Sequence, residues 1–193
     1  MNDKEFLNFK KQVLKGKDFS KKGQIDSAIV DLVELINCQK SYVTLSSCSG
    51  RTIVVSQSEL KKGCRWIYTT HGEVDDDEFL NKCSENSIND LVVKFEPFIL
   101  HVGCQSLENA KSLLSCALNC GYRNSGIVLG ANGKITLGVR STLNVEVPIS
   151  NSGGLLVSLE YLKFLGSECN KKMDKNLKQF KNFEAALIEF FNT

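Results

Sequence analysis

The hydrophobic pattern of this chain changes its period, and that change restricts the fold to a mixture of helix and sheet. Over residues 24–37 the apolar side chains recur at intervals of three and four residues, which predicts a helix with one buried face. Runs of β-branched and aromatic residues follow at 42–45, 52–55 and 65–70, and they predict strands. An α+β fold is therefore expected.

Other periodic segments predict further helices. One is expected at 3–15, and another is opened by the acidic run 75–78, because carboxylates suit a helix N-terminus better than they would suit a magnesium site at this spacing. A third is expected over 106–120, where Gly121 is placed to end it. The last is one long helix over 158–191.

The remaining strands are predicted from alternation and turn signals. Residues 91–102 form a long apolar run in which Pro97 indicates a sheet edge or a bulge. Asn132-Gly133 predicts a hairpin. Leu143-Asn144 is expected to reverse the chain into a final strand at 145–149.

The 193 residues suit a single domain over 1–193. It would consist of N-terminal helices in 1–40, a core at 41–150 and the C-terminal helix. Within the core, 67–72 and 99–103 resemble each other, since each runs from an apolar strand through a histidine to a glycine and then a helix. This internal similarity predicts a duplicated core with a mirrored order of elements.

Several classes of protein are excluded by missing motifs. The sequence has no G-x-G-x-x-G after a strand, no phosphate-binding loop of the G-x-x-x-x-G-K-[ST] type, and neither G-x-S-x-G nor H-E-x-x-H. A Rossmann-type site is therefore not expected. No Cys-x-x-Cys occurs among the eight cysteines, so a zinc or other metal site is not expected either.

The N-terminal stretch is too charged for a signal peptide, and no apolar run is long enough to span a membrane. A cytoplasmic location without membrane contact is expected, with the cysteines as reduced thiols.

Charge is spread unevenly along the chain. Residues 1–22 and 170–181 each carry a net charge of +4, whereas 23–169 carry −4. Two basic ends would suit a phosphate-binding edge. Solvated helix faces are the alternative, and on charge alone they are favoured.

Small polar residues crowd into Ser46-Ser47-Cys48-Ser49-Gly50-Arg51, between two predicted strands. Such a segment buries little apolar surface, so it is expected to be a loop that cradles a ligand. Cys48 is either a nucleophile within it or an inert packing residue.

Three of the four arginines, Arg51, Arg123 and Arg140, also stand among small polar residues. Their planar forks suit phosphate or carboxylate recognition, and structural salt bridges are the alternative. Glu96, alone on an apolar strand, is expected to pair with one of them. The two histidines, His71 and His101, end matching strands, so that either would serve as a general base or as a structural residue.

Four blocks, in this order and covering nearly the whole chain, resemble the wybutosine-synthesising methyltransferase family, the third enzyme of the tRNA wybutosine pathway. They are Ser46–Arg51, Lys94–Val102, Gly121–Gly126, and Val139–Thr142 with Val145–Pro148.

The resemblance implies an enzyme with an internally duplicated α+β fold that is not Rossmann-type. It implies methylation of a ring nitrogen, N-4, of a tricyclic guanosine derivative beside the anticodon of tRNA(Phe), with S-adenosylmethionine as donor. Relatives often carry His-Gly where this chain has Leu143-Asn144. Either that histidine is needed for activity or the position serves only as a turn, which Asn144 can supply.

Roles for individual residues follow from the resemblance as hypotheses. His101 or His71 would accept the proton that the ring nitrogen releases, and the lysines at both basic ends, with Lys171, Lys175 and Lys178 aligned on one helix face, would follow tRNA phosphates. The donor or the base would be bound by Ser46, Ser47, Cys48, Gly50, Arg51, Glu96, Arg123, Ser125, Gly126, Arg140 and Ser141. The alternatives are a non-catalytic tRNA-binding or scaffolding protein, and a thiol enzyme that depends on Cys48.

Overall fold

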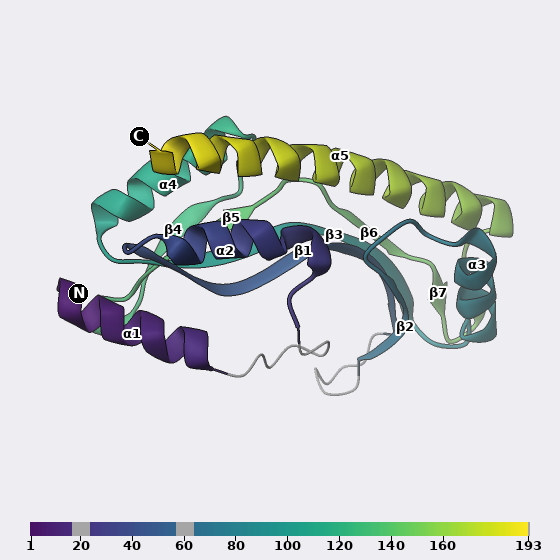
Figure 1. The fold of residues 1–193 in the computed structure, drawn as a ribbon. Coiled ribbons are helices and arrows are strands. Elements are labelled where there is room, and N and C mark those ends of the chain that lie inside the picture. The colour runs from purple at the N-terminus through teal and green to yellow at the C-terminus, as the bar shows by residue number, and fades with distance from the viewer. Residues whose placement is uncertain (17–23, 57–63, 193) are drawn as a thin grey trace. The chain divides into compact units, whose positions relative to one another are not determined.

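The computed structural model describes all residues except 17–23, 57–63 and 193 (Figure 1). Part of the basic stretch predicted at 1–22 therefore lies outside the described residues. The described chain forms two compact units. Unit 1 comprises Met1–Ser49, Phe98–Thr142 and Lys178–Thr193, and unit 2 comprises Gly50–Pro97 and Leu143–Leu177.

Three elements contribute residues to both units: strands β1 (Tyr42–Ser56) and β3 (Leu91–Cys104), and helix α5 (Leu159–Asn192). The long C-terminal helix was predicted from its periodicity, and the mixture of helix and antiparallel sheet confirms the α+β prediction. Among the described residues, no helix is both long enough and apolar enough to cross a bilayer.

In unit 1 the strands follow the order β1-β3-β5-β4, with β5 at Ile135–Arg140 and β4 at Gly126–Leu129. Both β3–β5 and β4–β5 are antiparallel. The β4–β5 hairpin is the predicted one, and Asn132 and Gly133 adopt positive φ angles of 58° and 71° within the short helix η3 (Ala131–Gly133) that joins the strands. The helices of this unit are α1 (Asp3–Lys15), η1 (Ser27–Ile29), α2 (Val30–Cys38), α4 (Leu107–Asn119) and the end of α5.

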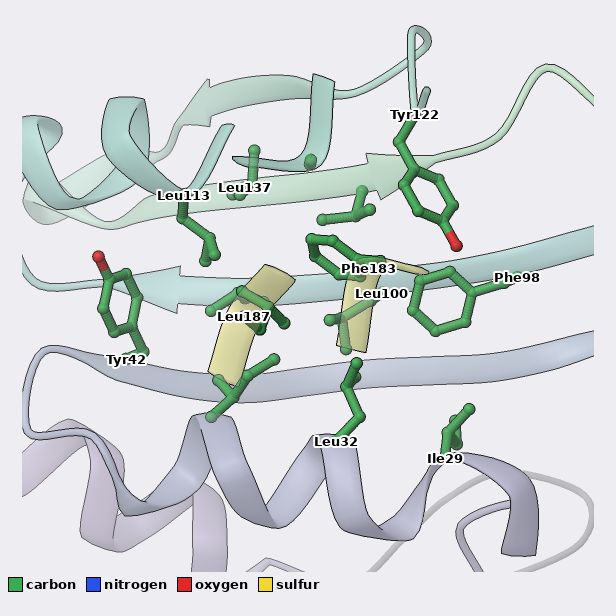
Figure 2. Close-up of a cluster of buried hydrophobic side chains, with 14 of the residues drawn as sticks. Ile29, Leu32, Tyr42, Phe98, Leu100, Leu113, Tyr122, Leu137, Phe183 and Leu187 are labelled. Atoms are coloured by element: carbon green, nitrogen blue, oxygen red, sulfur yellow. The ribbon is translucent and has the colours of Figure 1, made fainter. Parts of the chain in front are cut away.

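The core of unit 1 is built by helices and strands that the sequence separates widely (Figure 2). Leu32 of α2, Leu100 of β3 and Leu113 of α4 are fully buried there, together with Phe183 and Leu187 of α5. Helix α4 begins at an N-cap serine, Ser106, whose hydroxyl accepts from the Asn109 amide, and a glycine of positive φ, Gly121, follows its C-cap.

The helix predicted over 24–37 begins later than expected. Ile25 is the first apolar residue of the predicted buried face, but its side chain is 44% exposed. The backbone of Asp26 is extended instead, and its buried carboxylate accepts two hydrogen bonds from Ser49 of β1. A tertiary polar contact therefore overrides the helical period at this end.

In unit 2 the strand order is β2-β1-β3, and β6 pairs with the other side of β3. The bounds are Arg65–Thr70 for β2 and Val145–Pro148 for β6; the short strands Ser150–Asn151 (β7) and Gly154–Leu155 (β8) form a separate pair. Helix α3 (Asp76–Glu85) starts as predicted, with the Asp75 carboxylate accepting from the Glu78 amide.

Helix α5 packs against the start of α3 in unit 2. A Cβ on Gly166 of α5 would lie 3.4 Å from Cγ1 of Val74 and 3.8 Å from the ring of Phe79. These are ordinary van der Waals distances, and they show that α5 packs against the start of α3, where Leu162 and Leu165 join the core around Phe79.

The loop predicted at Ser46–Arg51 is wrong, because β1 runs without a break from Tyr42 to Ser56. Small polar residues bury little surface, yet their backbone groups can still pair with the neighbouring strands. Gly50, at φ 110°, supplies the one conformation in this segment that other residues rarely adopt.

Of the two alternatives predicted at Pro97, the sheet edge is wrong, because β3 is an internal strand. Pro97 lies between 92–95, which pair with β6, and 99–104, which pair with β5, so its missing N–H costs no bond to either. The reversal predicted at Leu143-Asn144 is also wrong. Both β5 and β6 are antiparallel to β3, so the chain does not reverse at Leu143-Asn144. Leu143 instead packs against the core of unit 2.

The two segments that resembled each other lie in different units. In unit 2, β2 is followed by α3, and in unit 1 the end of β3 is followed by α4. The predicted order of strand, then helix, is thus present once in each unit.

Candidate functional site

Alternation along β3 assigns His101 to one face of the unit 1 sheet. Phe98, Leu100 and Val102 enter the core together with side chains of α4 and α5. Because successive side chains of a strand point to opposite faces, His101 points to the other one. We call this the His101 face, and Arg140 shares it because its neighbour Val139 is in the core.

Ser46, His101 and Arg140 form a hydrogen-bonded chain on the His101 face. His101 Nδ1 lies 2.9 Å from the Ser46 hydroxyl, and Arg140 Nη2 lies 3.1 Å from His101 Nε2. A guanidinium can only donate, so Nε2 must accept. The ring is therefore neutral, and Nδ1 carries its proton and donates to Ser46.

Two physical effects keep this ring neutral. Burial lowers the pKa of His101, and the positive charge of Arg140 lowers the pKa further. A neutral imidazole is the form that can accept a proton near neutral pH. The lone pair that would accept it is the one now occupied by Arg140.

Two glycines lie beside His101 on the neighbouring strands, at paired positions across the sheet. His101 pairs with Gly138 of β5, and Gly138 pairs with Gly126 of β4. A Cβ on Gly138 would lie 3.4 Å from Cδ2 of His101 and from Nε of Arg140, whereas at Gly126 nothing lies within 4 Å. Glycines inside strands often mark the place where a ligand approaches the backbone. We call Gly138 and Gly126 the glycine row.

The turn 121–126 is fastened to the end of β5. The Ser125 hydroxyl accepts from the Arg140 amide at 3.0 Å, and the Asn124 side chain donates to the Ser141 carbonyl at 3.5 Å. Arg123 is exposed, and within the described part of the chain its guanidinium makes no ion pair. The turn therefore positions Arg140 and presents a second arginine to solvent.

Ser141 does not join this group. It is buried, and its hydroxyl donates to the Gln179 side chain of α5 at 2.9 Å. Gln179 in turn donates to the Cys120 carbonyl. Ser141 thus points to the core side of β5, where it supports the turn and not the ligand face.

In unit 2 the structure brings together Arg51, Glu96 and Trp66. Arg51 Nε and Nη2 lie 2.7 and 2.6 Å from one oxygen of Glu96, which confirms the expectation that Glu96 pairs with an arginine. The guanidinium carbon also lies 4.5 Å from the Trp66 ring centre, a cation–π contact that the sequence reading missed. Both charged side chains remain partly exposed, at 25% and 43%.

His71 lies at the end of β2 in the same unit. Its Nδ1 is 3.0 Å from the Gly50 carbonyl oxygen, which can only accept, so Nδ1 carries a proton here as well. His71 and His101 lie in different units. That both histidines line one cavity stays a prediction.

Sequence reasoning also missed the residue that anchors the Ser46–Arg51 segment. Both the amide and the hydroxyl of Ser49 donate to one carboxylate oxygen of Asp26, at 2.9 and 3.1 Å. Asp26 looked like an ordinary polar residue near the start of the predicted helix, and no local signal marks it as an anchor. Ser47 and Cys48 stay half-buried between this anchor and Ser46.

The three lysines predicted to follow phosphates are exposed on α5. Lys171 pairs with Glu168 at 2.6 Å. Lys178 belongs to unit 1, where α5 packs on the face of the sheet opposite His101. That these three lysines contact phosphates stays a prediction. Lys178 lies away from the His101 face.

Comparison with known proteins gives consistent matches over nearly the whole chain. The family described as Methyltransferase TYW3 matches residues 6–189. A Xenopus laevis protein named tRNA wybutosine-synthesizing protein 3 homolog is 43% identical over 187 residues, covering 94% of this chain and 74% of the relative.

Archaeal proteins match in sequence and in structure. A Thermococcus sibiricus protein named tRNA(Phe) 7-((3-amino-3-carboxypropyl)-4-demethylwyosine(37)-N(4))-methyltransferase is 32% identical, and 94% of each chain is covered. The solved structure of the PH1069 protein from Pyrococcus horikoshii superposes with a TM-score of 0.80 at 30% identity, covering 96% of this chain and 93% of that one.

Proposed function

The chain belongs to the Methyltransferase TYW3 family, and we propose that it methylates N-4 of the tricyclic wybutosine precursor in tRNA(Phe), with His101 as the group that accepts the released proton. Family membership makes it an enzyme of wybutosine biosynthesis. The proposal assigns the residues that bind the substrate and the residue that accepts the proton.

The observation that carries the proposal is the pair of hydrogen bonds at the two ring nitrogens of His101. Ser46 accepts from Nδ1 and Arg140 donates to Nε2, so the ring is held neutral with its basic nitrogen directed to Arg140. Nitrogen methylation of a ring N–H leaves a proton to be removed. A neutral imidazole on a partly open sheet face supplies that acceptor.

The base would lie over the glycine row. Gly126 has open space above it and stands two strands away from His101 in the same cross-strand row. Without side chains, this part of the sheet presents a flat backbone surface, which suits a planar ring system.

Arg140 would also bind a carboxylate of the substrate. The substrate named for the Thermococcus relative carries a 3-amino-3-carboxypropyl group and hence a carboxylate. That carboxylate would draw the Arg140 guanidinium away from Nε2, since a charged acceptor binds a guanidinium more strongly than a neutral ring does. Binding of the correct substrate would thus free the nitrogen that takes the proton.

The methyl donor of the proposal is S-adenosylmethionine, and the residues of unit 2 fit its amino acid group. Arg51 would bind the carboxylate and Glu96 the ammonium, because the two side chains carry complementary charges at one partly exposed place. Trp66 adds an aromatic face next to Arg51. When bound, the donor would supply a methyl group on a positively charged sulfur; the new bond would form between the base nitrogen and the methyl carbon, and the bond from that carbon to sulfur would break.

The test is methyl transfer from labelled S-adenosylmethionine to tRNA(Phe) that carries the unmethylated precursor. The wild-type chain should label the tRNA, and His101→Gln should lower kcat by about 100-fold or more, the usual contribution of a general base. His71→Gln serves as the matched control. Full turnover by His101→Gln would remove His101 from this role, and equal losses in both variants would assign no special part to it.

The non-catalytic alternative predicts a different result. A scaffolding protein of this fold would bind tRNA but give no heat signal when titrated with S-adenosylmethionine, with or without tRNA. A thiol enzyme would lose its rate in Cys48→Ser, whereas the proposed mechanism expects that variant to keep it.

A further inference from the structure

Helix α1 covers the same face of the unit 1 sheet that carries His101. Gly103 lies two residues beyond His101 on β3 and therefore points to the same side. A Cβ there would lie 3.2 Å from the Phe9 ring of α1. In Figure 1, α1 lies on one side of the unit 1 strands, and α4 lies on the other.

The outer side of α1 carries a row of lysines. Phe6 and Lys10 are buried on its inner side. Lys4, Lys11 and Lys15 are exposed and follow one another at seven and four residues, which places them on one side of the helix. We call these three the α1 lysine row; at 1.5 Å per residue it spans about 16 Å.

Among the described residues, neither carboxylate of α1 forms an ion pair with these lysines. Glu5 accepts from the Asn2 amide in the capping box, and Asp3 accepts from the Gln105 side chain at 2.6 Å. Lys134 adds a further ammonium beside α1, 5.4 Å from the Phe9 ring centre. The described acids of this helix are thus turned to local contacts, while the ammonium groups face outward.

We propose that the α1 lysine row, with Lys134, binds the phosphate backbone of the substrate tRNA, and that Lys178, the α5 lysine of the same unit, does not bind it. This inference rests on the proposed function, since it assumes that the reacting base lies on the His101 face. A polyanion whose base reaches that face passes α1, whereas Lys178 lies behind the sheet on the opposite face. Sequence-independent phosphate contacts are what exposed lysines supply.

The experiment compares two charge-reversed chains of equal net charge. One carries Lys4→Glu, Lys11→Glu and Lys15→Glu, and the other carries Lys171→Glu, Lys175→Glu and Lys178→Glu. Binding of unmodified, in vitro transcribed tRNA(Phe) is measured by fluorescence anisotropy at several salt concentrations.

The α1 variant should bind tRNA at least about tenfold more weakly than wild type. The slope of its log binding constant against log salt concentration should be smaller in magnitude by about 2. The α5 variant should stay within about threefold of wild type. The opposite ranking, or equal losses in both, would overturn the inference.

Two controls keep the result interpretable. Circular dichroism and thermal unfolding should match wild type, since none of the substituted side chains is buried. The neutral set Lys4→Gln, Lys11→Gln and Lys15→Gln should lose part of the affinity; full retention of affinity would count against the α1 lysine row.

If wild type methylates tRNA while the α1 variant binds it normally, this inference fails and the proposed function stands. If wild type transfers no methyl group, the proposed function fails, whatever α1 binds.

Discussion

Ser46 Oγ and His101 Nδ1 lie 2.9 Å apart, and this hydrogen bond decides which nitrogen of the ring is available for chemistry. With the proton held on Nδ1, the lone pair is on Nε2, toward Arg140. In the proposed mechanism Ser46 is therefore a positioning residue, whose effect on catalysis would act through His101.

Ser46→Ala should lower kcat about two- to tenfold, because one neutral hydrogen bond contributes about 0.5–1.5 kcal/mol. The binding of S-adenosylmethionine should not change. Ser46→Thr keeps the hydroxyl on the strand and should restore most of the rate. If the alanine and threonine variants turn over equally, Ser46 does not hold the ring.

The titration of His101 gives a second prediction. The chain has only two histidines, so two-dimensional NMR of the ring protons resolves both, and His101→Gln assigns them. Burial and Arg140 lower the pKa of His101, so its signal should titrate below the ordinary histidine value. Arg140→Gln removes the nearby positive charge and should raise that pKa.

The lowered pKa of His101 determines how activity and stability should change with pH. His101 stays neutral as the pH falls to values where an ordinary histidine is protonated, so the acidic limb of kcat should lie below about pH 6.5 and move up in Arg140→Gln. Its contribution to stability is complete above the ordinary histidine pKa and decreases as the pH falls below it. A pKa of His101 at or above the ordinary value would contradict the arrangement.

Gly138→Ala tests the glycine row. The new Cβ would lie 3.4 Å from His101 Cδ2 and from Arg140 Nε, at the short end of van der Waals contact, and it would occupy the space over the sheet beside both side chains. We expect a displaced His101 signal and a loss of kcat. Gly126→Ala meets no atom within 4 Å, so it should leave the His101 signal unchanged and raise KM for the tRNA if the base lies over it. A normal His101 signal in Gly138→Ala would refute the contact.

Asp26→Ala should destabilise unit 1. It leaves the buried amide and hydroxyl of Ser49 without this acceptor, at a cost of about 2 kcal/mol or more in the free energy of unfolding. Urea denaturation measures the change. Asp90→Ala, at an exposed position, is the control and should have almost no effect. Equal stabilities would mean that Asp26 does not anchor β1.

Two tyrosines in the same core make a matched pair. Tyr122 is fully buried, and among the described residues its hydroxyl has no hydrogen-bond partner, whereas the Tyr42 hydroxyl donates to the Asn109 carbonyl at 3.1 Å. Tyr122→Phe should therefore leave the free energy of unfolding unchanged or raise it by up to about 1 kcal/mol, and Tyr42→Phe should lower it by about 1 kcal/mol. The reverse order in thermal denaturation would contradict the hydrogen bonding seen here.

The sequence allowed most of the helices to be located, because their signals are local. The N-cap residues Asp75 and Ser106 and the glycine after α4 were recognisable without any tertiary information. The same local rules failed at Asp26, where a contact with Ser49, 23 residues away, decides the backbone. They failed again at Ser46–Arg51, because polar residues that look like a loop have neighbouring strands to pair with.

What the sequence determined by itself is the α+β class, most of the helices and the polar residues from which a site could be built. Only the tertiary structure decided how these residues combine. His101 meets Ser46 and Arg140 across separations of 55 and 39 residues, and the register of the β3–β5 pairing sets the glycine opposite His101. A shift of that register by one residue would turn the partner side chains to the other face, so the site exists through strand pairing, which no local pattern encodes.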